Sequence, residues 1–159
     1  MPELPEVEYY RRLAERTIGR VVAQLHTPDA WFLKGGLSGV VLAHALVGTS
    51  FVAVRRIGKL LLLDTEGRGT LGLRFGMTGR LLVDGLSGVG QLLYCRRREE
   101  TAWDRLRLMF ADGGDLVVRD PRRLGGVLLD PDESRLGVDA ASVTLAGLRR
   151  ALAGSGTPL

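Results

Sequence analysis

The stretches FVAVRRIGKLLLLDT (51–65) and TLGLRFGMTGRLLVD (70–84) decide the predicted fold. Both are rich in aliphatic and β-branched residues, and both are bounded by glycine-rich or acidic turn sequences. Three shorter runs of the same kind follow, DRLRLMFAD (104–112), DLVVRD (115–120) and GGVLLD (125–130). Many short strands separated by turns are typical of a sandwich or barrel. The sequence therefore predicts an α+β, mainly β domain: a β-sandwich with flanking helices.

Helical patterns lie on both sides of these strands. An N-terminal helix is expected to end at Gly19, and a last helix is expected to begin at Thr144, whose hydroxyl can cap it. Between the first helix and the strands, residues 20–27 are predicted as a strand and 37–47 as a short helix. The apolar face of the first helix is expected to comprise Leu4, Val7, Leu13, Ala14 and Ile18.

The composition is that of an ordinary globular domain, with 159 residues, 45% of them hydrophobic, and a net charge of +4. No apolar run is long enough to span a bilayer and nothing resembles a cleavable signal, so we expect a cytoplasmic protein. As a separate expectation, a monomer is favoured. The single Cys95 excludes an internal disulfide. Because the sequence has only two histidines, His26 and His44, in addition to this cysteine, we predict no metal site. We interpret Cys95 as a bystander thiol.

The octet MPELPEVE (1–8) opens the first predicted helix and admits two interpretations. In the first it is only a helix start, because proline and acidic residues suit the first turn. That interpretation needs Pro5 but leaves Pro2 unexplained. In the second, Met1 is removed, as is usual before a small residue, and Pro2 becomes an N-terminal secondary amine.

A free amine on Pro2 would be a nucleophile, because α-amines have a much lower pKa than lysine and the nearby helix start disfavours their charged form. Attack of a secondary amine on an aldehyde-like carbon gives an iminium that has no N–H proton to lose. Such an iminium is a persistent electron sink and suits covalent lyase chemistry. Glu3, the next residue, could shuttle protons in this reaction.

Two internal segments place single residues in unusual surroundings. Lys59 follows a glycine inside a β-patterned run, where glycine permits close approach of another molecule; the alternative is an edge strand with a solvated lysine. Met77 lies between Gly76 and Thr78 in a turn that pushes its side chain outward; the alternative is a methionine that fills the core.

The segment RDPRRLGG (119–126) is predicted to be a turn that carries Arg122, Arg123 and an unexpectedly apolar Leu124 at its tip. An apolar residue beside two arginines is the pattern of a wedge that enters a base stack while the arginines hold phosphates or an unpaired base. A solvated charged turn is the alternative.

Together these motifs resemble one family, the formamidopyrimidine-DNA glycosylases and endonuclease VIII enzymes of base-excision repair. The resemblance covers residues 1 to about 135, and 136–159 resemble the start of that family's helical domain. We therefore expect a catalytic β-sandwich domain over 1–135 and a truncated helical domain over 136–159. The motifs, in chain order, are MPELPEVE (1–8), Gly58-Lys59, GMTGRL (76–81) and DPRR (120–123).

The resemblance implies a DNA glycosylase with AP lyase activity that acts on damaged double-stranded DNA without a small-molecule cofactor. Pro2 would attack C1′ of the damaged nucleotide and form a Schiff base, and Glu3 would protonate the sugar ring oxygen. Glu6 would organise the N-terminal site and Lys59 would bind the phosphate next to the lesion. The residues that fill the gap left by the flipped nucleotide would be Met77, Arg122 and Leu124.

The sequence also departs from the family pattern. Leu124 stands where phenylalanine is usual, Arg74 where many members have histidine, and Trp103-Asp104 where a His-Asp pair is usual. The family's helix-two-turn-helix domain and zinc finger are not in this sequence, so we expect no zinc and only weak, salt-sensitive DNA binding. Oxidised purines are favoured over pyrimidines as lesions. A non-catalytic DNA- or partner-binding module, or an inactive N-terminal fragment of a longer enzyme, are the alternatives.

Overall fold

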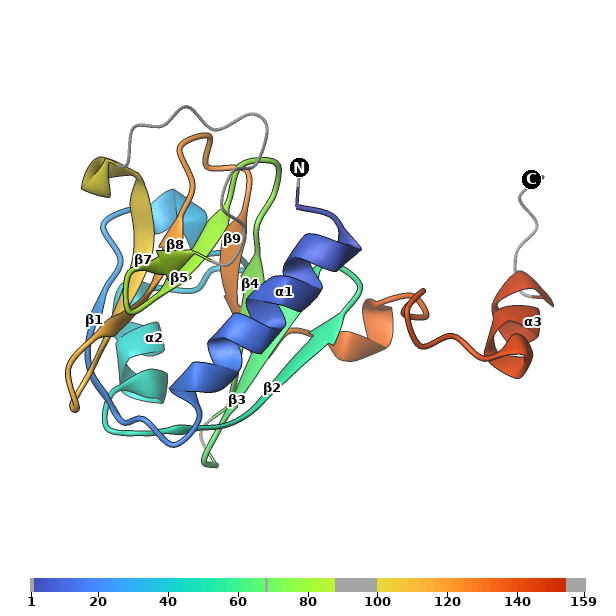
Figure 1. Cartoon of the computed structure of the whole chain (residues 1–159), viewed down its shortest axis with the longest axis horizontal. Coiled ribbons are helices and arrows are strands. Elements are labelled where there is room, and N and C mark those ends of the chain that lie inside the picture. The colour runs from blue at the N-terminus through green and yellow to red at the C-terminus, as the bar shows by residue number, and fades with distance from the viewer. Residues whose placement is uncertain (1, 68, 88–99, 154–159) are drawn as a thin grey trace.

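The computed structural model describes residues 2–67, 69–87 and 100–153 and shows the predicted β-sandwich of two antiparallel sheets (Figure 1). Cys95 lies outside the described residues. The first sheet has the strand order β2-β3-β4-β9, with β2 (Phe51–Ile57), β3 (Leu60–Thr65), β4 (Thr70–Arg74) and β9 (Gly126–Leu129). The second has the order β1-β7-β8-β5-β6, with β1 (Val22–His26), β7 (Asp104–Phe110), β8 (Asp115–Arg119), β5 (Arg80–Val83) and β6 (Leu86–Ser87).

One hydrophobic core lies between the sheets, and strand patterning explains which residues fill it. Along β7 buried and partly exposed residues alternate, as expected for a strand with one face on the core. In β3, by contrast, the four consecutive leucines are all buried, so this strand is covered on both faces. The core includes Leu61 and Leu63 of β3, Leu71 and Leu73 of β4, Leu106 and Leu108 of β7, and Leu116 and Val118 of β8.

The helix α1 (Leu4–Ala14) contacts strands of both sheets, namely β2, β3 and β5. Its buried residues are Val7, Tyr10, Leu13 and Ala14, so most of the predicted apolar face is confirmed. The prediction for Ile18 is wrong: the α-helix ends at Ala14 and a 3-10 turn over Glu15–Thr17 follows, which takes Ile18 off the helical face and leaves it 43% exposed.

The long run 51–65 is not one strand, which corrects our placement of Lys59 inside a β-patterned run. Gly58 and Lys59 form a two-residue turn between β2 and β3, in which Ile57 pairs with Leu60. Gly58 has φ +56°, a backbone conformation that glycine adopts without strain and that tight hairpin turns require. Lys59 therefore lies at the tip of a hairpin.

Two further helices complete the description. The helix α2 (Gly39–Leu46) begins at Ser38, whose hydroxyl accepts a hydrogen bond from the Val41 N–H. The helix α3 (Leu145–Ala153) begins as predicted after Thr144, whose hydroxyl accepts a hydrogen bond from the Gly147 N–H at 3.1 Å. None of the residues of α3 is buried, and Figure 1 shows it apart from the sandwich. In the described part of the chain no helix is long and apolar enough to cross a membrane.

Candidate active site

A cavity of about 570 Å³ gathers residues from distant parts of the chain. Four of the predicted site residues line it, and the segment after β9 contributes to it as well. This agreement matters because the four residues were singled out from separate motifs, up to 122 positions apart in the sequence. The predicted residues in the lining are Pro2, Lys59, Met77 and Leu124, and those of the later segment are Leu136, Gly137 and Val138.

The N-terminal wall of the cavity is fixed by the first turn of α1. The Glu3 N–H donates to the Glu6 carboxylate at 3.0 Å, and the Glu3 carboxylate in turn accepts from the Glu6 N–H. This reciprocal arrangement is a capping box, which satisfies two backbone donors at a helix start. Glu6 therefore holds the backbone of Glu3, and with it the position of Pro2, which is buried.

One carboxylate and two cations lie at or beside the cavity. The Lys59 Nζ is 2.5 Å from the Glu3 Oε2, and the two side chains are 52% and 46% exposed. Arg74, the last residue of β4, also lines the cavity and is exposed. Two positive groups beside a partly apolar cavity suit a ligand with anionic groups at its edge.

Met77 and Leu124 come from two loops that each cross from one sheet to the other. Residues 75–79 join β4 to β5, and residues 120–125 join β8 to β9. The loops touch at Gly76, where an added Cβ would lie 2.5 Å from the carbonyl carbon of Leu124, so only glycine fits there. Met77 is 44% exposed and Leu124 is 52% exposed, so both apolar side chains project outward as predicted.

A buried carboxylate, which is not among the predicted site residues, joins the two loops. Asp120 is fully buried, and its side chain accepts hydrogen bonds from the Thr78 hydroxyl (2.6 Å), the Arg122 N–H (3.1 Å) and the Gly125 N–H (2.9 Å). These donors compensate the loss of water around the carboxylate. Asp120 thereby fixes the separation of the two tips; in the sequence it precedes Pro121, a pattern that indicates only a turn.

The two arginines of the second loop are placed differently from each other. Arg122 is exposed, whereas the Arg123 guanidinium forms a two-pronged ion pair with Asp29 at 2.6 and 2.7 Å. The Arg123 hydrogen bonds, together with the charges of Arg123 and Arg105, hold the pKa of Asp29 below its ordinary value although burial opposes this. Among the described residues, Leu124 lines the cavity and neither of these two arginines does.

The unusual Trp103-Asp104 pair lies outside the cavity lining, at the start of β7. Asp104 is 6% exposed, and its carboxylate contacts Arg107 at 2.8 Å and Arg119 at 2.6 Å. The contact with Arg119 joins β7 to β8 within the five-stranded sheet, and the contact with Arg107 lies within β7. The position therefore has a structural role in this chain.

Comparison with known proteins shows which family the sequence resembles. The sequence profile of the family described as "Formamidopyrimidine-DNA glycosylase N-terminal domain" matches residues 1–127. A formamidopyrimidine-DNA glycosylase of Azorhizobium caulinodans is 36% identical over 137 residues, covering 82% of this chain and 45% of the relative. That of Variovorax paradoxus is 38% identical over 138 residues, covering 84% of this chain and 44% of the relative. The chain thus spans less than half the length of these relatives.

Solved structures of Fpg (MutM) have the same fold as this chain. The complex of wild-type Lactococcus lactis Fpg (MutM) with DNA containing N7-benzyl-Fapy-dG superimposes with a TM-score of 0.64 and 27% identity, covering 80% of this chain and 43% of that one. A structure of MutM in complex with DNA containing carbocyclic 8-oxo-G also gives a TM-score of 0.64, with 26% identity and the same coverage of both chains. The likeness extends over the sandwich rather than over part of one sheet.

Proposed function

The chain belongs to the formamidopyrimidine-DNA glycosylase family, and from this premise we propose that it carries the catalytic domain of a base-excision repair enzyme. The enzyme would remove oxidised bases, with purines favoured, from double-stranded DNA and then cleave the abasic site. One observation carries the proposal: Pro2, Lys59, Met77 and Leu124, from four separate motifs, line a single cavity.

The chemistry starts at Pro2 once Met1 has been removed. The free amine attacks C1′ of the damaged nucleotide, and the glycosidic bond breaks as the base leaves with the electron pair of that bond. Glu3 accepts the proton that the Pro2 nitrogen loses after the attack and passes it to the sugar ring oxygen, so the C1′–O4′ bond opens and an iminium forms between Pro2 and C1′. Loss of a proton from C2′ then expels the 3′ phosphate, and loss of a second proton, from C4′, expels the 5′ phosphate. The placement of Glu3 next to Pro2 and beside Lys59 supports these roles.

Lys59 has the position expected of a phosphate ligand. Its ammonium is half exposed at a hairpin tip, so a phosphate can replace the Glu3 carboxylate as its partner without a change in the fold. Release of Glu3 from Lys59 by the substrate would then free the carboxyl for proton transfer. Arg74 adds a second cation to the cavity lining, and it pairs with Leu60, the residue that follows Lys59.

The exposed loop tips support base flipping. C1′ is inaccessible while the nucleotide is stacked, so the damaged nucleotide must leave the helix, which costs a few kcal/mol. Met77 and Leu124 are apolar, exposed and held by Asp120 at a fixed separation, so they can occupy the vacated space. Arg122 lies beside them and can contact the base left opposite.

Borohydride trapping tests the proposal. The protein is incubated at low salt with a duplex that carries an abasic site or an oxidised guanine, then reduced, and the adduct is mapped by mass spectrometry. We expect a covalent adduct on residue 2 that disappears in Pro2→Gly and in protein that retains Met1. An absence of adduct from protein with Met1 removed, while salt-sensitive binding to the same duplex persists, would instead identify a non-catalytic DNA-binding module.

A further inference from the structure

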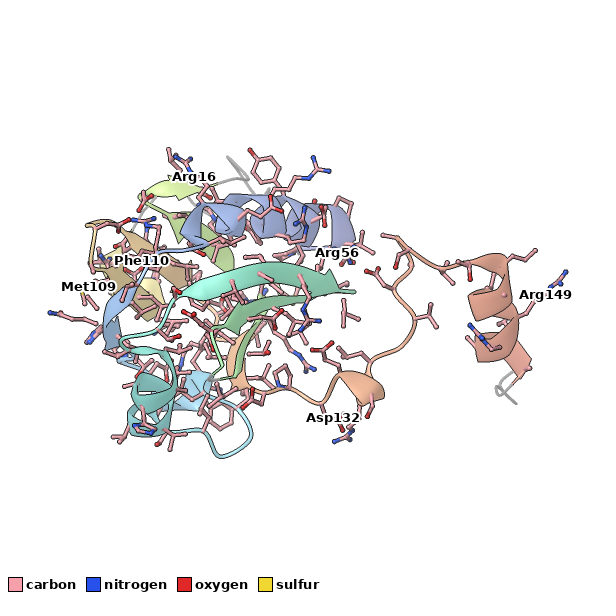
Figure 2. The ribbon with its side chains drawn as sticks, turned by 90° about the horizontal axis from the view of Figure 1, so that it is seen from below. Arg16, Arg56, Met109, Phe110, Asp132 and Arg149 are labelled. Carbon is pink, nitrogen blue, oxygen red and sulfur yellow. The ribbon has the colours of Figure 1, made fainter. Side chains whose placement is uncertain are left out.

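Arg56, the residue before the last one of β2, has a side chain that is only 7% exposed and whose guanidinium contacts three parts of the chain. Its Nε donates to Glu8 at 3.2 Å, and its Nη1 donates to the Gly58 carbonyl at 2.8 Å. The same Nη1 is 2.9 Å from Asp139, in the segment 130–144 that joins β9 to α3 and is called the linker below. In Figure 2 Arg56 lies by the end of α1 nearest to this linker.

Each partner of Arg56 lies in a different segment that contributes residues to the cavity. Glu8 is in α1, whose first turn positions Pro2, and Gly58 is the first residue of the turn that carries Lys59. Asp139 directly follows the three linker residues, 136–138, that line the cavity. One planar guanidinium therefore connects the nucleophile's helix, the phosphate-binding turn and the linker wall.

The carboxylate of Asp139 is stabilised in its ionised form by several hydrogen bonds. Burial alone would raise the pKa of the Asp139 carboxyl, but hydrogen bonds from the Ala141 N–H, the Arg56 guanidinium and the Gly58 N–H outweigh it and lower that pKa. Asp139 is thus ionised at neutral pH and binds both the Gly58 backbone and the side chain that holds the Gly58 carbonyl. Loss of this carboxylate would leave a nearly buried cation with one partner fewer.

The neighbouring Arg55 provides a natural comparison. It points to the opposite face of β2, as successive strand residues do, and binds Asp64 at 2.5 Å and Glu133 at 2.8 Å. Glu133 is also in the linker, so this pair holds the same segment to the same strand. Neither Arg55 nor its two partners is among the described residues that line the cavity, whereas Arg56 contacts Gly58, which does line it. Arg55 is also more exposed, at 40%.

We propose that Arg56 is a positioning residue of the reaction: by holding Asp139 and the Gly58 carbonyl together, it sets the distance of Lys59 and of linker residues 136–138 from Pro2. The inference rests on the proposed function, because it assigns Arg56 a role in positioning residues of the same cavity. Arg56 touches no reacting atom in this scheme. Its effect is on geometry, and displacement of a reacting group by about 1 Å can lower a rate by about 100-fold.

The test uses Asp139→Asn, which keeps the size of the side chain and removes its charge, with Asp139→Glu as the conservative variant. Glu133→Gln is the matched control, because it weakens the other ion pair of the same linker. Two readouts are compared: hydrogen exchange of the 57–61 turn, and the rate of borohydride-trapped adduct formation as a function of DNA concentration. The first readout needs no DNA.

We expect Asp139→Asn to speed exchange in the 57–61 turn and to lower the trapping rate at saturating DNA about 10- to 100-fold, with little change in the half-saturating concentration. Asp139→Glu should recover part of that rate, and Glu133→Gln should change neither readout more than about twofold. Wild-type exchange in Asp139→Asn, or equal effects of Glu133→Gln, would overturn the inference. If the wild-type protein forms no adduct, the proposed function fails, and the exchange comparison alone decides whether the contacts of Asp139 with Arg56 and Gly58 couple the linker to the turn.

Discussion

The helices α1 and α3 have similar lengths, 11 and 9 residues, and both have an apolar side and an arginine-bearing side, yet their surroundings differ completely. The helix α1 buries four residues against both sheets, and its first turn forms a wall of the cavity. The helix α3 buries none, and Leu145, Leu148 and Leu152 are 66%, 43% and 52% exposed. An amphipathic pattern therefore specifies a helix but not the surface that it packs on.

The largest expected effect is at the centre of α1. Tyr10 is fully buried, its ring centroid is 4.6 Å from that of Phe75, and its hydroxyl donates to the Gly79 carbonyl at 3.4 Å. Tyr10→Ala removes the largest side chain that joins α1 to the loop carrying Met77, so we expect a loss of about 3–5 kcal/mol of unfolding free energy. Denaturant unfolding followed by circular dichroism measures it.

The control for this prediction is Tyr10→Phe, which keeps the ring and removes the hydroxyl. A loss of about 0.5–1.5 kcal/mol is expected from the hydrogen bond alone. If Tyr10→Ala were no more destabilising than Tyr10→Phe, the docking of α1 would not depend on burial of the ring, and the contrast with α3 would lose its basis.

An intermediate effect is expected at Glu8, on the outer side of α1. Burial alone would raise the pKa of the Glu8 carboxyl, but hydrogen bonds from Arg11, Arg56 and Arg12 lower it from its ordinary value of 4.5. A carboxyl whose pKa is lower in the folded protein stabilises the fold above its ordinary pKa, and this stabilisation is lost as pH falls through the folded value. Glu8→Gln should therefore cost about 1–2 kcal/mol at pH 7 and progressively less below about pH 4.5.

Unfolding free energies of wild type and Glu8→Gln, measured from pH 7 to pH 3, test this prediction. Glu15→Gln is the matched control, because Glu15 is more exposed and binds only the Arg11 side chain among the ion pairs described for α1. A difference between wild type and Glu8→Gln that stays constant over this pH range would mean that the charge of Glu8 has no part in holding α1. The helix α3 contains no acidic residue, so its own stability should not follow this pH dependence.

The same contrast explains how much of the molecule could be predicted from its sequence. The strands and the three helices follow from periodicity and turn residues, which are local signals. The hairpin at Gly58 and Lys59 was missed because β3 is buried on both faces, so its leucines form an unbroken run with no visible boundary. The division of 70–84 between two sheets also has no local signal: β4 and β5 each pair with a neighbouring strand, β3 or β6, but their other partners, β9 and β8, lie far along the chain.

The candidate site follows the same rule. Pro2, Lys59, Met77 and Leu124 were predicted because each lies in a motif with its own signal, and the cavity brings them together. Arg56 and Asp139 were missed because their ion pair joins positions 83 residues apart. Asp29 and Arg123, 94 residues apart, were missed as a pair for the same reason. A charged residue in an otherwise apolar strand, as in Arg55-Arg56, is the signal that could have directed attention there.

The smallest expected effect is in α3. Leu148 is the least exposed of its three large apolar residues, yet it is still 43% exposed, and alanine and leucine have similar helix propensities. Leu148→Ala should therefore change the unfolding free energy by no more than about 0.5 kcal/mol, whereas Leu13→Ala, the matched change in α1, should cost about 2–5 kcal/mol. Parallel denaturant unfolding of the two variants measures the difference.

A loss above about 1 kcal/mol in Leu148→Ala would contradict the contrast between the helices, because it requires the apolar side of α3 to be buried in solution. Sedimentation of the wild-type protein and of Leu148→Ala would then show whether a second copy of the chain covers that side.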